Sequence, residues 1–411
     1  MTGTVKPPLD FALRDFRVRA SEAELDDLAR RLAATRWPTP VSDEREGFGL
    51  GTSRPWLEAL VAYWRDGFDW RTQEDWLAAK LPSQLARIRG LDVHFSRIRA
   101  EAPGNAAAMA GPRPLPLLLL HGWPSSYVEM HRLVEPLTRP AANGAPSAPA
   151  FDVVVASIPG HGFSGAPRDP RFGADEAADL LCTLMVDVLG YDRFGVHGGD
   201  RGAFVAAGLG HRHPAHVEGL HLSLPLGIPA PLEARPAAET AWLESSARWQ
   251  AEEGGYSAIQ STRPRSLAYG LTDSPVGLAG WILEKFCAWS DCDGDPLNVF
   301  DRDELLTNVM IYWLSGSIGS SIQYYHAHRV APPSAMRPVR IEVPTGVLLC
   351  AKETWRPPRS AVERKFPVVR WTEVDRGGHF AALEVPDVVV EELRAFFGGS
   401  SPPTQPRPVN A

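Results

Sequence analysis

Several features of secreted, nucleic-acid-binding and membrane proteins are scarce or missing in this sequence. Only 4 of the 411 residues are cysteine, too few and too scattered for a disulfide framework, which favours a reduced, cytoplasmic setting. The formal net charge is -7 and no long basic run occurs, so no nucleic-acid partner is expected. The N-terminal residues include prolines but no apolar run, so no secretory signal is predicted.

Long hydrophobic runs and several common motifs are also missing. The apolar run from Leu115 to Leu120 is far too short to span a bilayer, so a soluble protein without a membrane anchor is expected. The pattern G-x-S-x-G, which presents a nucleophilic serine in many esterases, does not occur, which argues against a serine esterase. No phosphate-binding loop, dinucleotide fingerprint or convincing metal-ligand cluster is present, so neither a cofactor nor a metal is predicted.

From residue 115 onward, short apolar runs alternate with helix-forming stretches. This alternation is typical of an α/β fold, with a parallel sheet and helical crossovers. The interval of about 120 residues after the fourth run is too long for a crossover, so it is predicted to be an inserted helical lid. The predicted strands are Leu115–Leu120, Phe151–Ser157, Arg193–His197, Val217–Ser223, Gly346–Cys350 and Val368–Val374.

The first hundred residues are predicted to be mainly polar helix. Ser21–Leu32 begins with a capping residue and places its leucines on one helical face, which predicts a helix there. Gln84–Ile98 is predicted to form two strands around a turn at Arg89 and Gly90. At the other end of the chain, the Gly/Ser/Pro-rich tail is predicted to be disordered.

The stretch V-H-G-G-D-R-G-A-F, Val196–Phe204, crowds small residues around Asp200 between a predicted strand and a predicted helix. Small residues suit a sharp turn that exposes a nucleophile, because larger side chains would collide with the neighbouring strand or helix. Asp200 is therefore the candidate nucleophile. The alternative is a glycine-rich turn in which Asp200 merely caps the helix.

Other candidate residues follow the ends of the later predicted strands, where an open α/β sheet places its ligand site. His379, flanked by glycine and Phe380 after the last strand, is the candidate general base. Glu353, just beyond the preceding strand, is the candidate acid that orients this histidine. Asp375, four residues before the histidine, is the rival acid.

An aspartate nucleophile restricts the substrate to an alkyl electrophile. A serine would form a stable ether with an sp³ carbon, whereas a carboxylate forms an ester that histidine-activated water can cleave. An epoxide then needs a proton from a phenol, and a halide needs N–H donors such as indoles. The lid interval supplies phenols in E-G-G-Y-S-A-I-Q, with Tyr256, and in G-S-S-I-Q-Y-Y-H, with Tyr324 and Tyr325.

Further motifs occur along almost the whole chain. They are T-R-W-P (Thr35–Pro38), Y-W-R-D-G-F-D-W (Tyr63–Trp70), H-G-W-P (His121–Pro124), D-S-P-V-G-L-A-G-W-I-L-E-K-F (Asp273–Phe286), L-L-T-N-V-M-I-Y-W (Leu305–Trp313) and R-G-G-H-F-A-A-L-E-V-P (Arg376–Pro386). In this combination the chain resembles the microsomal-type epoxide hydrolase family. The resemblance implies an α/β-hydrolase core with a mostly parallel sheet, a helical lid inserted after the core strand ending near residue 223, and an N-terminal segment that wraps lid and core.

The resemblance also implies a division of the chain into parts. These are an N-terminal epoxide-hydrolase-type segment over 1–83, the first half of the core over 84–224, the lid over 225–340, the second half of the core over 341–397 and the disordered tail over 398–411.

Roles for individual residues follow from the same resemblance. Asp200 matches the family nucleophile, His379 the base and Glu353 its acid partner. Tyr256 and Tyr325 match the two phenols that open the ring. Tyr324 is the alternative to Tyr325, since adjacent helical residues face different ways.

The backbone N–H groups of Trp123 and Arg201 are implied to form the oxyanion hole. Arg201 stands where the family usually has tryptophan, but its backbone N–H survives this change. Its side chain is expected to pair with a buried acid or to point under the lid. The alternative is a contact with a polar or anionic group of the substrate.

The sequence thus predicts a cofactor-independent epoxide hydrolase that converts a small-molecule epoxide to a vicinal diol. An aspartate-dependent dehalogenase is the alternative of the same fold, although Arg201 removes the adjacent indole donor. A non-catalytic ligand-binding protein is the alternative of a different class. A homo-oligomer is compatible with the sequence.

Overall fold

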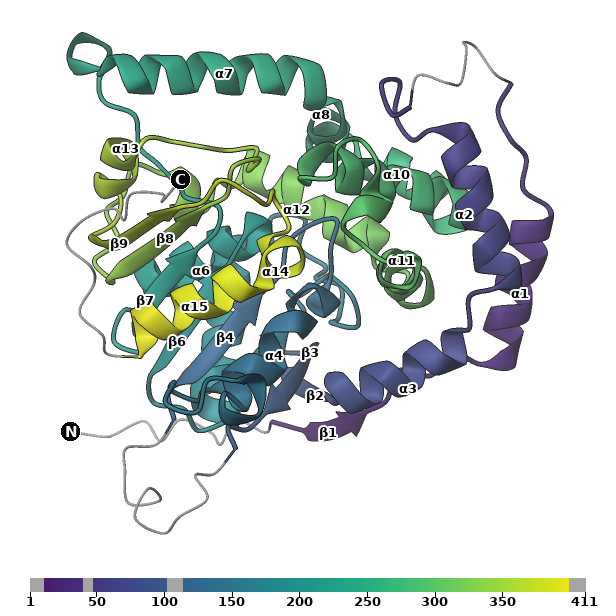
Figure 1. Cartoon of the computed structure of the whole chain (residues 1–411), viewed down its shortest axis with the longest axis horizontal. Coiled ribbons are helices and arrows are strands. Elements are labelled where there is room, and N and C mark those ends of the chain that lie inside the picture. Colours follow the sequence, from purple (N-terminus) through teal and green to yellow (C-terminus); the bar gives the residue numbers. More distant parts are fainter. Residues whose placement is uncertain (1–10, 40–46, 102–113, 399–411) are drawn as a thin grey trace.

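A nine-stranded sheet of order β1-β2-β3-β5-β4-β6-β7-β8-β9 lies at the centre of the described molecule (Figure 1). The structure is a computed structural model that describes residues 11–39, 47–101 and 114–398. Every predicted strand from residue 115 onward is confirmed, each boundary shifted by no more than one residue. These parallel strands are β4 (Pro116–Leu120), β5 (Asp152–Ala156), β6 (Phe194–Gly198), β7 (Val217–Leu222), β8 (Thr345–Leu349) and β9 (Val368–Glu373).

Continuous apolar runs form the central strands because helices cover both faces of the sheet. Along β4, Leu117 and Leu119 join a core that includes residues of α4 (His131–Thr138) and α15 (Pro386–Phe397). The alternate residues of β4 join a second core, with α5 (Ala174–Thr183) and α6 (Asp200–Arg212). The alternation of side chains along a strand therefore divides this run of leucines between two hydrophobic layers.

An antiparallel extension continues the sheet beyond β5. The predicted hairpin is confirmed as β2 (Ser83–Ile88) and β3 (Leu91–Ile98), with positive φ at both turn residues, Arg89 (48°) and Gly90 (81°). The prediction of mainly polar helix before this hairpin did not include β1 (Leu13–Phe16), which pairs with β2 at the sheet edge. Most of its four residues are exposed, so the sequence carries no apolar pattern for this strand.

Helices of the N-terminal region run along the lid side of the molecule: α1 (Glu22–Ala33), α2 (Arg54–Asp66) and α3 (Trp70–Lys80) (Figure 1). The predicted helix after Ser21 is confirmed, and a capping box between Ser21 and Glu24 fixes its start. Two hydrogen bonds tie α2 to the lid region: Trp56 donates to Asp295 over 3.0 Å and Tyr63 to Asp303 over 2.7 Å.

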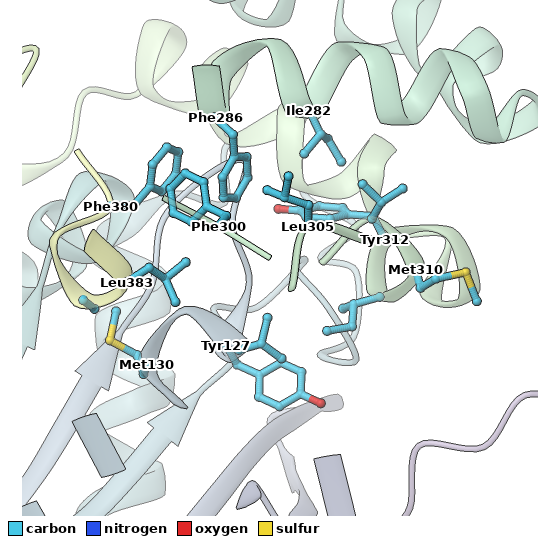
Figure 2. Close-up of a cluster of buried hydrophobic side chains, with 14 of the residues drawn as sticks. Tyr127, Met130, Ile282, Phe286, Phe300, Leu305, Met310, Tyr312, Phe380 and Leu383 are labelled. Atoms are coloured by element: carbon cyan, nitrogen blue, oxygen red, sulfur yellow. The ribbon is translucent and has the colours of Figure 1, made fainter. Parts of the chain in front are cut away.

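The helices between β7 and β8 occupy the interval for which the lid is predicted. They are α7 (Ala237–Glu253), α8 (Gly255–Thr262), α9 (Pro264–Asp273), α10 (Pro275–Trp289), α11 (Arg302–Ser315) and α12 (Ile318–Val330). Figure 2 shows aromatic and aliphatic side chains of α10 and α11 packed with Phe380 and Leu383 from the C-terminal part of the core. A continuous hydrophobic cluster therefore joins these helices to the core.

Short helices α13 (Arg359–Glu363) and α14 (Ala381–Glu384) complete the C-terminal part of the fold. Within the described ranges, no helix combines the length and the apolar character needed to cross a bilayer. The predicted disordered tail, apart from Gly398, lies outside the described residues.

Candidate active site

Asp200 lies on a sharp turn between β6 and α6, and its φ of 40° is unusual for a residue other than glycine. Two glycines near this turn leave no room for a side chain. A Cβ added at Gly122 would lie 2.3 Å from the Asp200 Cβ, and one added at Gly202 would lie 2.3 Å from the Leu120 carbonyl oxygen. The N-cap of α6 is Gly199, so a capping role does not account for the aspartate.

Three side chains from separate loops meet beyond the carboxyl ends of the strands. The Nε2 atom of His379 lies 3.4 Å from the Asp200 Oδ2 atom, and its Nδ1–H donates to Glu353 Oε1 over 2.9 Å. The backbone N–H of Trp123 donates to Asp200 Oδ1 over 2.8 Å. Asp375, the rival acid, is exposed, and the Nδ1–H of His379 is bonded to Glu353 instead. The structure thus brings Asp200, His379 and Glu353 together.

The two carboxylates and the imidazole stabilise one another's charged forms. Burial alone would raise the pKa of Asp200, but His379 and Arg201 lower that pKa to about 2. Burial disfavours a charged His379, yet Glu353 and Asp200 hold its pKa well above the ordinary value. At neutral pH Asp200 is therefore ionised, and its charge and that of Glu353 favour the protonated form of His379.

Two phenols reach the same cavity from the lid region. Tyr256 of α8 stacks on Trp123, with ring centroids 5.5 Å apart, and Tyr325 of α12 meets the same indole edge-on at 5.7 Å. Burial raises the pKa of Tyr325 to about 12, and the nearby Arg201 charge opposes this rise. Its buried hydroxyl has no hydrogen-bond partner among the described residues, so this O–H is available to a ligand.

Tyr324, the alternative proton donor, points elsewhere. Its ring packs edge-on against His161 at 5.0 Å and against Phe172 at 6.2 Å, in the second hydrophobic layer. It does not line the cavity that contains Asp200, whereas Tyr325 does. The structure therefore brings Tyr325, and not Tyr324, to the candidate nucleophile.

The Arg201 side chain lies under α12. Its Nη1 donates to the Nδ1 atom of His328 over 2.8 Å, and its guanidinium carbon lies 3.7 Å from the centre of the Tyr325 ring. Among the described residues, no carboxylate lies within ion-pair distance of it. Two arrangements without a substrate contact were predicted for this side chain. Pairing with a buried acid is wrong, whereas a position under the predicted lid is found.

Asp200, His379, Tyr256 and Tyr325 all line one cavity of about 840 Å³. This volume suits a small organic ligand. Apolar side chains of α7 and of the loops after β7 and β8 form one part of its wall, with Leu224, Ile228, Trp249 and Trp355 among them.

Sequence reasoning missed three residues that hold this site together. The backbone carbonyl oxygen of Trp289 accepts the backbone N–H of His379 over 2.9 Å. Glu384 accepts the backbone N–H groups of Gly378 and Phe380, each over 2.8 Å, and so brackets the histidine. His328 fixes Arg201. Glu384 belongs to the quoted R-G-G-H-F-A-A-L-E-V-P motif, which was the available signal for it, whereas the other two contacts depend on distant chain segments.

The fold and this site define an α/β hydrolase that carries an aspartate on the turn after β6. The family description "Epoxide hydrolase N terminus" matches residues 13–130, and "alpha/beta hydrolase fold" matches residues 116–252. Epoxide hydrolase 1 of Sus scrofa is 34% identical to this chain, over 95% of this chain and 89% of that protein. The chain belongs to the epoxide hydrolase family of enzymes.

Solved structures agree with this assignment. The juvenile hormone epoxide hydrolase of Bombyx mori has a TM-score of 0.85 at 29% identity, with 95% of each chain covered. The epoxide hydrolase of Aspergillus niger has a TM-score of 0.80 at 29% identity, over 95% of this chain and 97% of that chain. The predicted fold class and the predicted family are therefore confirmed.

Proposed function

We propose that this enzyme converts a small-molecule epoxide to a vicinal diol through a covalent ester on Asp200. One observation carries the proposal: a carboxylate in contact with the His379–Glu353 pair shares a single cavity with two phenols, the buried Tyr325 and the half-buried Tyr256. The carboxylate supplies the nucleophile, and the phenols supply the proton that ring opening needs.

In the first step, Asp200 Oδ2 bonds to an epoxide carbon and the carbon–oxygen bond of the ring breaks. The electron pair moves to the ring oxygen, which takes a proton from the pair Tyr256 and Tyr325. Asp200 Oδ1, which already accepts the Trp123 N–H, becomes the carbonyl oxygen of the ester. Because burial raises the pKa of Tyr325 to about 12, this phenol stays protonated at neutral pH.

In the second step, His379 takes a proton from water, and the resulting hydroxide attacks the ester carbonyl of Asp200. The negative charge then develops on Oδ1, where the Trp123 N–H and, we propose, the Arg201 N–H stabilise it. The bond between the carbonyl carbon and Oδ2 breaks, and the departing oxygen takes the proton from His379. The remaining proton of the water returns to the tyrosinate.

Ester formation itself prepares the histidine for this second step. While Asp200 is ionised, its charge helps to raise the pKa of His379. Alkylation removes that charge, so the pKa of His379 falls and the neutral base becomes more populated. Glu353 remains to orient the ring and to stabilise the imidazolium that forms.

A dehalogenase would need N–H donors for a halide in place of phenols. Trp289 lines the cavity, and its buried indole N–H has no partner among the described residues, so a haloalkane belongs in the substrate panel. The phenols of Tyr256 and Tyr325 favour the epoxide, because a halide leaves without a proton. A non-catalytic ligand-binding protein would turn over neither substrate.

A single-turnover reaction in H₂¹⁸O, with excess enzyme and mass spectrometry of protein and product, tests the ester mechanism. The diol is expected to carry an unlabelled oxygen from Asp200, and ¹⁸O is expected to enter the protein at that residue. Label that appears in the diol during this first turnover, with none in the protein, would contradict the ester. Asp200→Ala is the matched control, which should incorporate no label.

A further inference from the structure

The cavity that contains Asp200 is strongly cationic, although the whole chain is acidic with a formal net charge of -7. Asp200 is the only carboxylate among the described residues that line it. Four permanently or largely charged cations share the wall: Arg201, Arg329, Arg337 and Lys365. We call these four residues the cationic wall. The net charge of the chain does not explain this local excess of cations. The excess instead points to a ligand that carries negative charge.

Arg201 is the member of this wall next to Asp200, whose charge acts on it, but no carboxylate of the described residues forms an ion pair with it. It is held by Nη1 on His328 and by the face of Tyr325, while its buried Nε has no partner among the described residues. Burial and the charge of Arg201 keep the pKa of His328 well below its ordinary value, so this imidazole accepts a hydrogen bond without offsetting the charge. The Asp200 oxygens are already engaged by Trp123 and His379.

The other members of the cationic wall differ in their surroundings. Lys365 is buried, and its ammonium donates to two uncharged acceptors, the carbonyl oxygens of Ser334 and Arg337. Arg337 has one carboxylate neighbour, Asp175, over 3.1 Å. Arg329 lies beside His328 at the exposed end of α12, and no carboxylate in the described part of the chain forms an ion pair with it. Arg201 and Lys365 are withdrawn from water without a carboxylate ion pair among the described residues, which is costly, and an anionic ligand relieves that cost.

We propose that the epoxide substrate carries a carboxylate or a comparable anionic group, which Arg201 binds while the oxirane lies between Asp200 and Tyr325. This inference rests on the proposed epoxide hydrolase function. The apolar part of the cavity, with Leu224, Ile228 and Trp249, accommodates the hydrocarbon part of such a substrate. The outer cations, Arg329 and Arg337, attract the anion toward the cavity.

Another role for Arg201 would follow from its contact with Tyr325. A cation over the phenol ring makes that phenol a stronger acid, which would speed ring opening for every substrate. The two roles predict different kinetics. An anion-binding Arg201 acts on charged substrates and mainly on KM, whereas an acid-strengthening Arg201 acts on all substrates and on kcat.

The test uses epoxycarboxylates of graded chain length, each compared with its primary amide, which has nearly the same size and no charge. The wild-type enzyme is expected to prefer the acid in kcat/KM for at least one chain length. In Arg201→Gln, kcat/KM for that acid should fall about 10- to 100-fold, mainly through KM, because a hydrogen bond to a charged group is lost. The value for the amide should change much less. Arg212→Gln, on the exposed end of the same helix, is the control and should retain the preference.

The inference is overturned if the wild-type enzyme hydrolyses the amides as well as or better than the acids at every chain length. The proposed function survives that result, because the neutral epoxides are still hydrolysed. Equal losses in kcat for acid and amide in Arg201→Gln would also overturn it, in favour of the action on Tyr325. If neither acids nor amides are hydrolysed, the proposed function itself fails, and this inference fails with it.

A second measurement needs no variant. A saturated carboxylate without an epoxide ring should inhibit the wild-type enzyme competitively, at least about 10-fold more strongly than its amide. This inhibition should weaken as salt rises from 0.05 to 0.5 M, since salt screens the attraction between charges. Equal inhibition by carboxylate and amide would contradict an anion-binding wall.

Discussion

At the scale of single residues, His379 is unusual in contacting two carboxylates at once. The Nδ1 atom of His379 lies 2.9 Å from Glu353 Oε1, and its Nε2 atom lies 3.4 Å from Asp200 Oδ2. Both charges favour the imidazolium, whereas burial opposes it, and the balance raises the pKa of His379. The same side chain must be neutral to act as a base. Its two partners therefore determine the pH range in which the second step is fast.

This balance predicts different pH profiles for the two steps. Ester formation should be insensitive to pH between 5 and 9, because the pKa of Asp200 is about 2 and that of Tyr325 about 12. Ester hydrolysis should rise with pH, about tenfold per unit below the pKa of His379, because only the neutral imidazole accepts the proton. Rapid-quench kinetics with detection of the alkylated protein separates the steps.

The variant Glu353→Gln tests whether the charge of Glu353 raises the pKa of His379. Removal of this negative charge should lower the pKa of His379 and move the inflection in ester hydrolysis to lower pH, while the maximal rate falls because imidazolium is less stabilised. An inflection that stays in place, or moves to higher pH, would show that Glu353 does not control the protonation of His379.

The two adjacent tyrosines give a second prediction at this scale. Tyr325→Phe should slow ester formation by about 100-fold, the lower end of the effect of a positioned proton donor. Tyr324→Phe should leave that rate within about twofold, because its ring packs against His161 and Phe172 outside the cavity. Rapid-quench rates of ester formation for the two variants show which tyrosine donates the proton. A larger effect from Tyr324→Phe would assign the proton donor to the other tyrosine.

At the scale of elements, the turn after β9 is held in place by the short helix α14. One carboxylate oxygen of Glu384 accepts N–H groups of Asp291, over 2.7 Å, and of Gly378, and the other accepts that of Phe380. His379 lies between the last two residues. The segment after α10 and the catalytic loop are thus fixed to one side chain.

Glu384→Gln is therefore expected to lower kcat by about 10-fold, because an amide keeps only one acceptor oxygen and three N–H groups need partners. KM should change little, since Glu384 does not line the cavity. Steady-state kinetics, together with a thermal melt to confirm folding, checks this result. Glu391→Gln, on the exposed face of α15, is the control. An unchanged kcat in a folded Glu384→Gln would contradict the positioning role.

The strands differ in how well the sequence could predict them. The parallel strands were predictable because their apolar runs are buried on both faces, and the loops that follow them indicated Asp200, Glu353 and His379. The edge strand β1 was not, because its exposed residues carry no apolar pattern. The surroundings of Arg201 depend on His328, 127 positions away, and no local pattern encodes such a contact.

At the scale of the whole molecule, the hydrophobic cluster of Figure 2 connects the helices after β7 to the loop that carries the catalytic histidine. The Phe286 ring of α10 stacks on Phe380 with centroids 4.3 Å apart, and Phe380 follows His379 in the chain. Phe300 meets both rings edge-on. This packing makes the position of the catalytic base depend on the lid region as well as on the core.

Phe286→Ala should therefore weaken folding and catalysis together. Truncation of a buried phenylalanine lowers the free energy of unfolding by about 3–5 kcal/mol, and Phe286 is only 2% exposed. Because the cavity left behind lies against Phe380, kcat should also fall at temperatures where the variant is still folded. Urea denaturation and steady-state kinetics measure the two effects. Tyr269→Ala, on the exposed side of α9, is the control and should change stability by less than about 0.5 kcal/mol. If Phe286→Ala lost stability but kept the full kcat at low temperature, the cluster would only stabilise the fold and would not position His379.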